Sequence, residues 1–145
     1  NISSVSGKMV YPILGAYAGS KHDLEAISDA LRRELLIYGV DVIVIEPGSV
    51  RTPIWAKADD LNVDVYADTD YYKMMKGMKK IFVRQGQTGI PVEKVSEAIW
   101  HALTAKRPKT RYPLPRKWLT GWFLPRWLPD RIFDNMVAKR MGIRG

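Results

Sequence analysis

The stretch Val40-Asp41-Val42-Ile43-Val44-Ile45, which leads into the turn Pro47-Gly48, is the part of the sequence that decides the fold. A run so continuous and so rich in β-branched residues is typical of a parallel strand that is covered on both faces. It follows a helical pattern over residues 16–38, and the residues before that pattern are those of a strand end, Asn1 to Ser4. Strand, helix and buried strand in this order predict a βαβ unit with a right-handed crossover.

The helical pattern over residues 16–38 rests on a spacing of apolar residues. Leu24, Ile27, Leu31 and Leu35 share one helix face, which we expect to be the packed face. Gly39 comes directly after the pattern and suits the left-handed residue that closes a helix.

Downstream, the pattern alternates between loops and helices. We expect a loop over residues 49–65 with a helical piece at 53–58, and a helix at 71–84 that is broken by residues 85–89. Further helices are expected from Pro91 to before Pro108 and at 130–141, and a strand at 110–112. The predicted class is therefore α/β, a Rossmann-like, doubly wound parallel sheet of which only the C-terminal strands and helices are present.

Composition narrows the class of protein further. The chain has 145 residues, 46% hydrophobic and 26% charged, which is typical of a folded domain rather than of a disordered or fibrous chain. With no cysteine and two histidines, the sequence predicts no metal site and fits a reducing compartment such as the cytoplasm. No apolar run approaches the roughly 18 residues that a membrane-spanning helix needs.

Chemistry is concentrated at the start of the first helix. Tyr17 and Lys21 are four residues apart, so their side chains lie one turn apart on one face. A free phenol ionises only near pH 10, but a neighbouring ammonium group favours the phenolate. Tyr17 is therefore a candidate general acid/base. Ser4 ends the preceding strand, where α/β sheets open their ligand crevice, and could bond the carbonyl oxygen that Tyr17 protonates.

Three motifs in this order resemble the short-chain dehydrogenase/reductase family. They are Asn1-Ile2-Ser3-Ser4-Val5-Ser6-Gly7, Tyr17-Ala18-Gly19-Ser20-Lys21 and Pro47-Gly48-Ser49-Val50-Arg51-Thr52. The resemblance implies an oxidoreductase that interconverts an alcohol and a carbonyl with NAD or NADP as cofactor. It implies that Ser4, Tyr17 and Lys21 are catalytic, and that the cofactor is bound by Tyr17, Lys21, Pro47, Gly48, Val50 and Thr52.

The chain departs from the family pattern at its beginning. The glycine-rich turn that seats the pyrophosphate is absent from the sequence, and so is the catalytic asparagine of the family. We therefore expect the C-terminal half of a catalytic domain over residues 1–115, followed by an extension over residues 116–145, and we expect this piece alone to be inactive. The alternative is a catalytically inactive remnant that serves as a binding or oligomerisation module.

Residues 53–88 correspond, by the resemblance, to a substrate-binding loop and lid. Candidates for an apolar substrate pocket are Trp55, Tyr66, Tyr71, Tyr72, Met74, Met75 and Met78. These side chains could equally cap the core. By contrast, we expect His22 and His101 to be packed or surface residues without a catalytic role.

The C-terminal tail holds most of the positive charge. Residues 1–105 carry a net charge of −1 and residues 106–145 a net charge of +9. Cations there alternate with apolar and aromatic residues: Trp118, Leu119, Trp122, Phe123, Leu124, Trp127 and Leu128. Such a segment suits a membrane interface and resembles tails of family members that act on lipophilic substrates. The alternative, which we favour, is a Trp-rich segment folded over the substrate pocket or over a subunit interface of a homo-oligomer. We expect no nucleic acid as partner.

Overall fold

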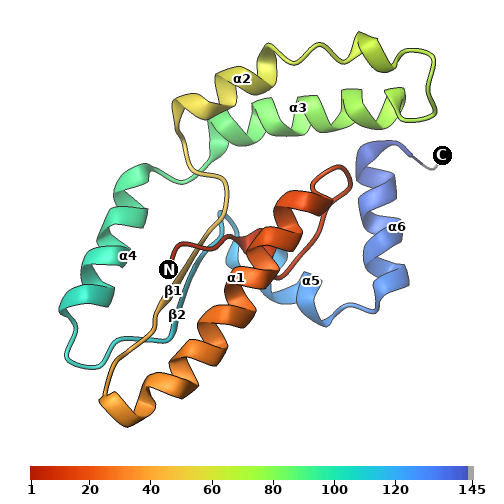
Figure 1. Cartoon of the computed structure of the whole chain (residues 1–145). Helices are drawn as coiled ribbons and strands as arrows, with labels where there is room; N and C mark the ends of the chain where they lie inside the picture. The colour runs from red at the N-terminus through yellow and green to blue at the C-terminus, as the bar shows by residue number, and fades with distance from the viewer. Residues whose placement is uncertain (144–145) are drawn as a thin grey trace.

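The computed structural model describes residues 1–143. The side chains of residues 59, 120 and 124 lie outside the described set, and so do residues 144 and 145. The helices are α1 (Gly15–Glu34), α2 (Ala56–Asp59), α3 (Tyr72–Thr88), α4 (Val92–Thr104), α5 (Leu124–Trp127) and α6 (Asp130–Met141), and the strands are β1 (Val44–Pro47) and β2 (Arg111–Leu114). Short 3-10 turns cover Val5–Gly7, Leu35–Tyr38, Pro53–Trp55 and Asp64–Tyr66, and a π-helical turn covers Leu119–Phe123. Figure 1 shows the two strands between α1 and α4, with α2 and α3 side by side at one end.

The strands form a small parallel sheet. β1 pairs with β2 in a register that sets Val44 opposite Arg111 and Pro47 opposite Leu114. Ile2 forms a parallel bridge with Ile45 on the other side of β1, so the expected strand end at residues 1–4 is present as a single bridge. Val44, Ile45 and Glu46 are buried, as expected for a central strand.

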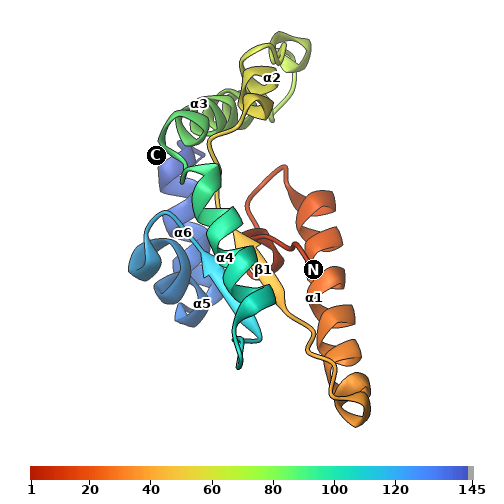
Figure 2. The same cartoon turned by 90° about the vertical axis from the view of Figure 1, so that its left-hand side faces the viewer.

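We expected a strand over residues 40–45, but in the structure β1 begins only at Val44. A strand extends only where a neighbour supplies hydrogen-bond partners, and β2 starts opposite Val44. The class is nevertheless α/β with a parallel sheet, and it corresponds to part of a Rossmann-like fold. Figure 2 shows α4 in front of the strands when the molecule is turned.

Helix α1 confirms the predicted position but packs through a different face. It buries Ala18, Glu25 and Ser28, whereas Ile27 is 61% and Leu31 37% exposed. The predicted apolar face is wrong because polar side chains of α1 meet the sheet, which periodicity of apolar residues does not reveal. At the end of the helix, Gly39 has a φ of 65°, which confirms the predicted left-handed cap.

Helix α3 continues through residues 85–88, where we expected a break, and ends at Thr88, with Gly89 as its C-cap. Two local contacts hold the extra turn. The Ser49 hydroxyl donates to Gln85 Oε1 at 3.1 Å, and Gly86 leaves the space in which the Trp55 ring packs, because any side chain there would collide with Trp55.

Helix α6 has the predicted bounds, Asp130–Met141. It lies next to α3 in both views (Figures 1 and 2), and its Phe133 ring is 5.9 Å from the Tyr11 ring. Within residues 1–143, no helix combines the length and the apolar character that a membrane crossing requires.

Candidate active site

Tyr17 and Lys21 lie in the first turns of α1, which begins at Gly15. The Lys21 Nζ is 5.8 Å from the centre of the Tyr17 ring and donates a hydrogen bond to the backbone oxygen of Ile2 at 3.1 Å. That bond ties the ammonium to the segment that carries Ser4. Tyr17 itself is 46% exposed, so its ring can reach a ligand.

Ser4 is buried, at 7% exposure, and its hydroxyl has two partners. It accepts a hydrogen bond from the Ser6 N–H at 3.1 Å and donates to the Pro47 carbonyl at 3.4 Å. The second bond is long for a hydroxyl donor, so it is weak. The Ser4 hydroxyl can therefore give up its bond to the Pro47 carbonyl and donate to a substrate oxygen at a small cost in free energy.

A cavity of about 600 Å³ brings the predicted site residues together. Its lining includes every one of them: Ser4, Tyr17, Lys21, Pro47, Gly48, Val50 and Thr52. They come from two segments that are far apart in the sequence, the start of α1 with the loop before it, and the turn after β1. A cavity of this size is typical of a binding site for a small organic molecule.

The remaining wall of the cavity is mostly apolar. Of the residues expected to line a substrate pocket, Trp55 and Met78 do so, whereas Tyr66, Tyr71, Tyr72, Met74 and Met75 are not among the lining residues. Sequence reasoning missed several others: Tyr11, Leu14, Ile54, Ile81, Phe82, Gln85, Val137, Arg140 and Met141. The last three belong to α6, whereas none of the described residues of the Trp-rich segment, 118–128, is among the lining residues.

The segment after β1 brings backbone and hydroxyl groups to the wall of the cavity. The Thr52 hydroxyl forms no capping bond with the turn that follows, which leaves it available to a ligand. The Val50 carbonyl accepts a hydrogen bond from Trp55 Nε1 at 2.6 Å, so the N–H is the part of the Val50 backbone that could serve a ligand. At Gly48 a Cβ would lie 3.3 Å from the Leu114 oxygen, which is tighter than most such contacts, so a glycine suits this turn.

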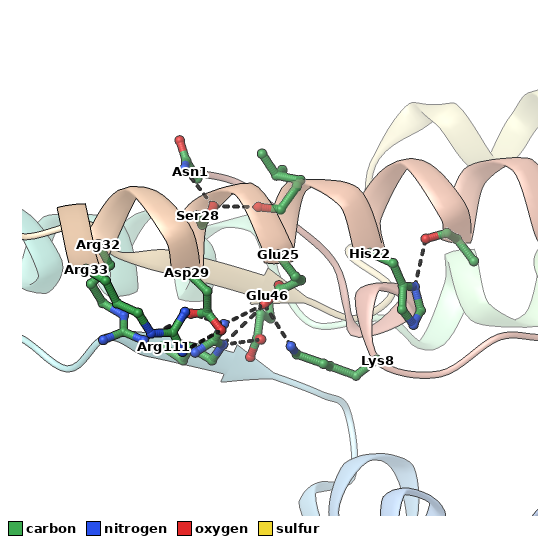
Figure 3. A network of polar contacts seen from close by, with 12 residues as sticks. Asn1, Lys8, His22, Glu25, Ser28, Asp29, Arg32, Arg33, Glu46 and Arg111 are labelled. Atoms are coloured by element: carbon green, nitrogen blue, oxygen red, sulfur yellow. Dashed lines mark hydrogen bonds and ion pairs between the residues drawn. The ribbon is translucent and has the colours of Figure 1, made fainter. Parts of the chain in front are cut away.

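A network of charged side chains connects α1 with the strands, and sequence reasoning missed it (Figure 3). Arg111 on β2 donates to Glu25 Oε2 from Nε at 3.2 Å and to Asp29 Oδ1 from Nη2 at 2.8 Å. Its Nε is also 3.3 Å from Oε1 of Glu46, and Lys8 Nζ is 3.1 Å from Glu25 Oε2. The network joins α1 to both strands just before the Pro47-Gly48 turn.

The two buried carboxyl groups of the network differ in their affinity for protons. Glu46 is fully buried, and its burial, together with the negative charge of Glu25, raises the pKa of Glu46 to about 7. Burial opposes ionisation of Glu25 too, but the ion pairs with Lys8 and Arg111 outweigh it and lower the pKa of Glu25. The pair therefore tends to hold one proton, on Glu46, near neutral pH.

Neither histidine has an environment that suggests catalysis. His22 Nδ1 bonds the Ala18 carbonyl at 2.9 Å within α1. His101 Nδ1 bonds the Tyr112 hydroxyl at 2.9 Å on the surface. Within the part of the chain that the structure describes, no cluster of three or more His, Cys, Asp or Glu side chains could hold a metal ion.

Comparison with known proteins identifies the family. Residues 1–62 match the family model of the short chain dehydrogenases. An NADPH-dependent 3-dehydrocapnine reductase of Ornithobacterium rhinotracheale is 45% identical over 95% of this chain and 48% of its own length. Human retinol dehydrogenase 5 is 33% identical over 96% of this chain and 48% of its own, and an oxidoreductase of Bacillus subtilis, YusZ, is 35% identical over 97% and 51%.

The α/β fold and a Ser-Tyr-Lys constellation beside a Pro-Gly turn define the class of protein, that of the Rossmann-like α/β folds. Within that class the chain belongs to the short-chain dehydrogenase/reductase family. It spans about half the length of the curated relatives that it matches.

Proposed function

We propose that the protein interconverts an alcohol and a carbonyl on a lipophilic substrate with NAD or NADP as cofactor. The observation that carries the proposal is the single cavity of about 600 Å³ that Ser4, Tyr17 and Lys21 share with the Pro47–Thr52 turn. Its mostly apolar wall supports a lipophilic substrate. Because a related reductase is NADPH-dependent, NADPH is the cofactor to test first.

We assign the residues of the cavity the following roles. A nicotinamide cofactor, when bound, supplies or accepts the hydride. The Ser4 hydroxyl gives up its long bond to the Pro47 carbonyl and donates to the substrate oxygen instead. Tyr17 delivers its phenolic proton to the same oxygen during reduction and takes it back during oxidation. Lys21, held by the Ile2 carbonyl, binds the ribose hydroxyls of the cofactor in this proposal.

The proposal is tested by the rate of NADPH oxidation with 2-decanone as substrate, measured on the native gene product. Tyr17→Phe removes the proton donor and keeps the ring, so we expect the rate to fall by a factor of about 100 or more. Cofactor binding, followed by calorimetry, should change little.

Tyr38→Phe is the matched control, because Tyr38 is 73% exposed and does not line the cavity. It should leave the rate unchanged. A Tyr17→Phe enzyme that kept more than half of the wild-type rate would refute the role of Tyr17. A wild-type protein that binds NADPH but turns over no ketone or alcohol would favour the inactive binding module instead.

A second candidate function concerns the tail, and an exposed aromatic cluster favours it. Trp118 and Phe123 stack with their ring centres 5.5 Å apart, and Phe123 contacts Trp127 at 6.2 Å. Trp118, Phe123 and Trp127 are 55%, 43% and 76% exposed, and Arg116 and Lys117 adjoin them in the sequence. We propose that this cluster contacts an anionic membrane surface peripherally.

Co-sedimentation with vesicles that contain phosphatidylserine tests this membrane contact. Replacing Trp118 and Trp127 by serine should reduce the bound fraction by a factor of about 3 or more, since each ring contributes apolar burial at the interface. Trp100→Ser is the control, because Trp100 is 70% exposed on α4, away from the cluster. Equal loss in the control and the double variant would refute a specific membrane contact.

We also propose that the protein works in the cytoplasm as a homo-oligomer. Support for the oligomer comes from exposed apolar residues near the end of α1: Leu36 is 68% and Ile37 80% exposed. Sedimentation velocity of wild type and of Ile37→Asp tests it, because a buried charge at a subunit contact should shift the protein toward the monomer. An unchanged sedimentation coefficient would exclude this surface.

A further inference from the structure

Arg140 is a cation at the edge of the cavity for which the reaction proposed above has no use. It lies one residue before the end of α6, and it lines the cavity together with Val137 and Met141 of the same helix. Because α6 comes from the far end of the chain, Arg140 reaches the cavity from a different element than Ser4 and Tyr17. Its role must therefore concern a part of the ligand other than the reacting oxygen.

Arg140 forms no ion pair with a carboxylate of the described residues. None of the described residues that line the cavity is an Asp or Glu. Cations at the cavity are Lys21 and Arg140, so the site as a whole is positive.

The positive charge of Arg140 also affects the pKa of a residue that lines the cavity, Tyr11. Tyr11 lines the same cavity, and burial raises the pKa of Tyr11 while the positive charge of Arg140 opposes that rise. The guanidinium is thus close enough to influence a partly buried phenol. A planar group with five N–H donors suits a carboxylate, sulfonate or phosphate, which it can bind through two parallel hydrogen bonds.

From this placement we propose that Arg140 binds an anionic group of the substrate, so that the cavity selects an amphiphile with an apolar body and a carboxylate, sulfonate or phosphate end. The apolar body contacts Trp55, Met78 and Phe82, and the anionic end lies against α6. This inference rests on the proposed function, and it names the substrate class of the same site.

Isothermal titration calorimetry with decanesulfonate and 1-decanol, below their aggregation concentrations, tests the proposal on the native gene product. Both probes have the same chain and differ in the charged end. We expect wild type to bind decanesulfonate tighter than decanol by a factor of about 5 to 10, since a charge-assisted bond to an exposed arginine contributes modestly. In the Arg140→Gln variant the ratio should fall to within a factor of about 2.

Lys139→Gln is the matched control, because it removes a neighbouring exposed cation of α6 that does not line the cavity. Its ratio should equal that of wild type. Arg140→Lys should keep part of the preference, which separates loss of charge from loss of structure. A ratio near one in wild type would overturn the proposal. A preference that survives Arg140→Gln and disappears in Lys21→Met would overturn it too, since the anion would then bind Lys21.

The outcome is independent of catalysis. The titration needs no turnover, so a protein that reduces no ketone could still show the preference. Conversely, Tyr17-dependent reduction of 2-decanone together with an unchanged binding ratio in Arg140→Gln would reject the substrate class and leave the proposed reaction in place.

Discussion

The Nε atom of Arg111 lies 3.3 Å from Oε1 of Glu46 on the neighbouring strand, and the side chain of Glu46 is completely buried. The same guanidinium donates to Glu25 and Asp29 on α1. One arginine therefore contacts three carboxyl groups, two on α1 and one on β1. The contact lies one residue before Pro47, so the position of the Pro47-Gly48 turn depends on it.

The raised pKa of Glu46 predicts a pH-dependent stability. Folding raises the pKa of Glu46 from 4.5 to about 7, so the folded state binds this proton more tightly than the unfolded state does. The free energy of unfolding should then fall by something on the order of 2–3 kcal/mol as the pH rises from about 4.5 to about 7. Urea unfolding at a series of pH values measures it. Glu25 and Asp29, whose pKa values are lowered, act in the opposite direction and only at lower pH.

Glu46→Gln should remove most of this slope, because an amide cannot ionise and keeps nearly the same shape. Glu93→Gln, on an exposed residue in the first turn of α4, should leave the slope as in wild type. A Glu46→Gln profile with the same fall between pH 4.5 and pH 7 would show that another group takes the proton.

Loss of the arginine should destabilise the fold at neutral pH. Arg111→Met leaves buried carboxylates without their main cation, and we expect a loss of about 2–3 kcal/mol at pH 8. The loss should be smaller at pH 5, where Glu46 is protonated, and smaller in the double variant with Glu46→Gln. Urea unfolding of the four proteins gives the coupling between the two residues. Additive effects would contradict a direct Arg111–Glu46 interaction.

Alanine substitutions at Gly39 and at Gly19 should change the stability of the fold in opposite directions. Gly39 has a φ of 65°, so Gly39→Ala should destabilise by about 1 kcal/mol. Gly19 lies within α1 with open space around its Cα, so Gly19→Ala should stabilise by about 0.5–1 kcal/mol. Thermal unfolding compares both with wild type, and a stabilising Gly39→Ala would contradict the left-handed cap.

What the sequence could predict is local. The cap at Gly39, the bounds of α6 and the juxtaposition of Tyr17 with Lys21 all depend on neighbours within a few turns. The family resemblance added the Pro47–Thr52 turn, which the structure brings to the same cavity as Ser4.

What the sequence could not predict depends on distant contacts. Arg111 and Glu25 are separated by 86 residues, so no pattern along the chain reveals their ion pair. For the same reason the apolar spacing of Ile27 and Leu31 indicated a packed face, whereas Glu25 and Ser28 face the sheet. Arg140 was missed because only the packing of α6 over the cavity gives it a function.

The most direct test of the central claim follows the hydride and the proton together. The native gene product is incubated with NADPH that carries deuterium at the transferable position and with 2-decanone, and the 2-decanol formed is examined by mass spectrometry. The account predicts one deuterium on the carbinol carbon with wild type, and product formation reduced by a factor of about 100 or more with Tyr17→Phe. Alcohol without deuterium, or equal product from Tyr17→Phe, would contradict it.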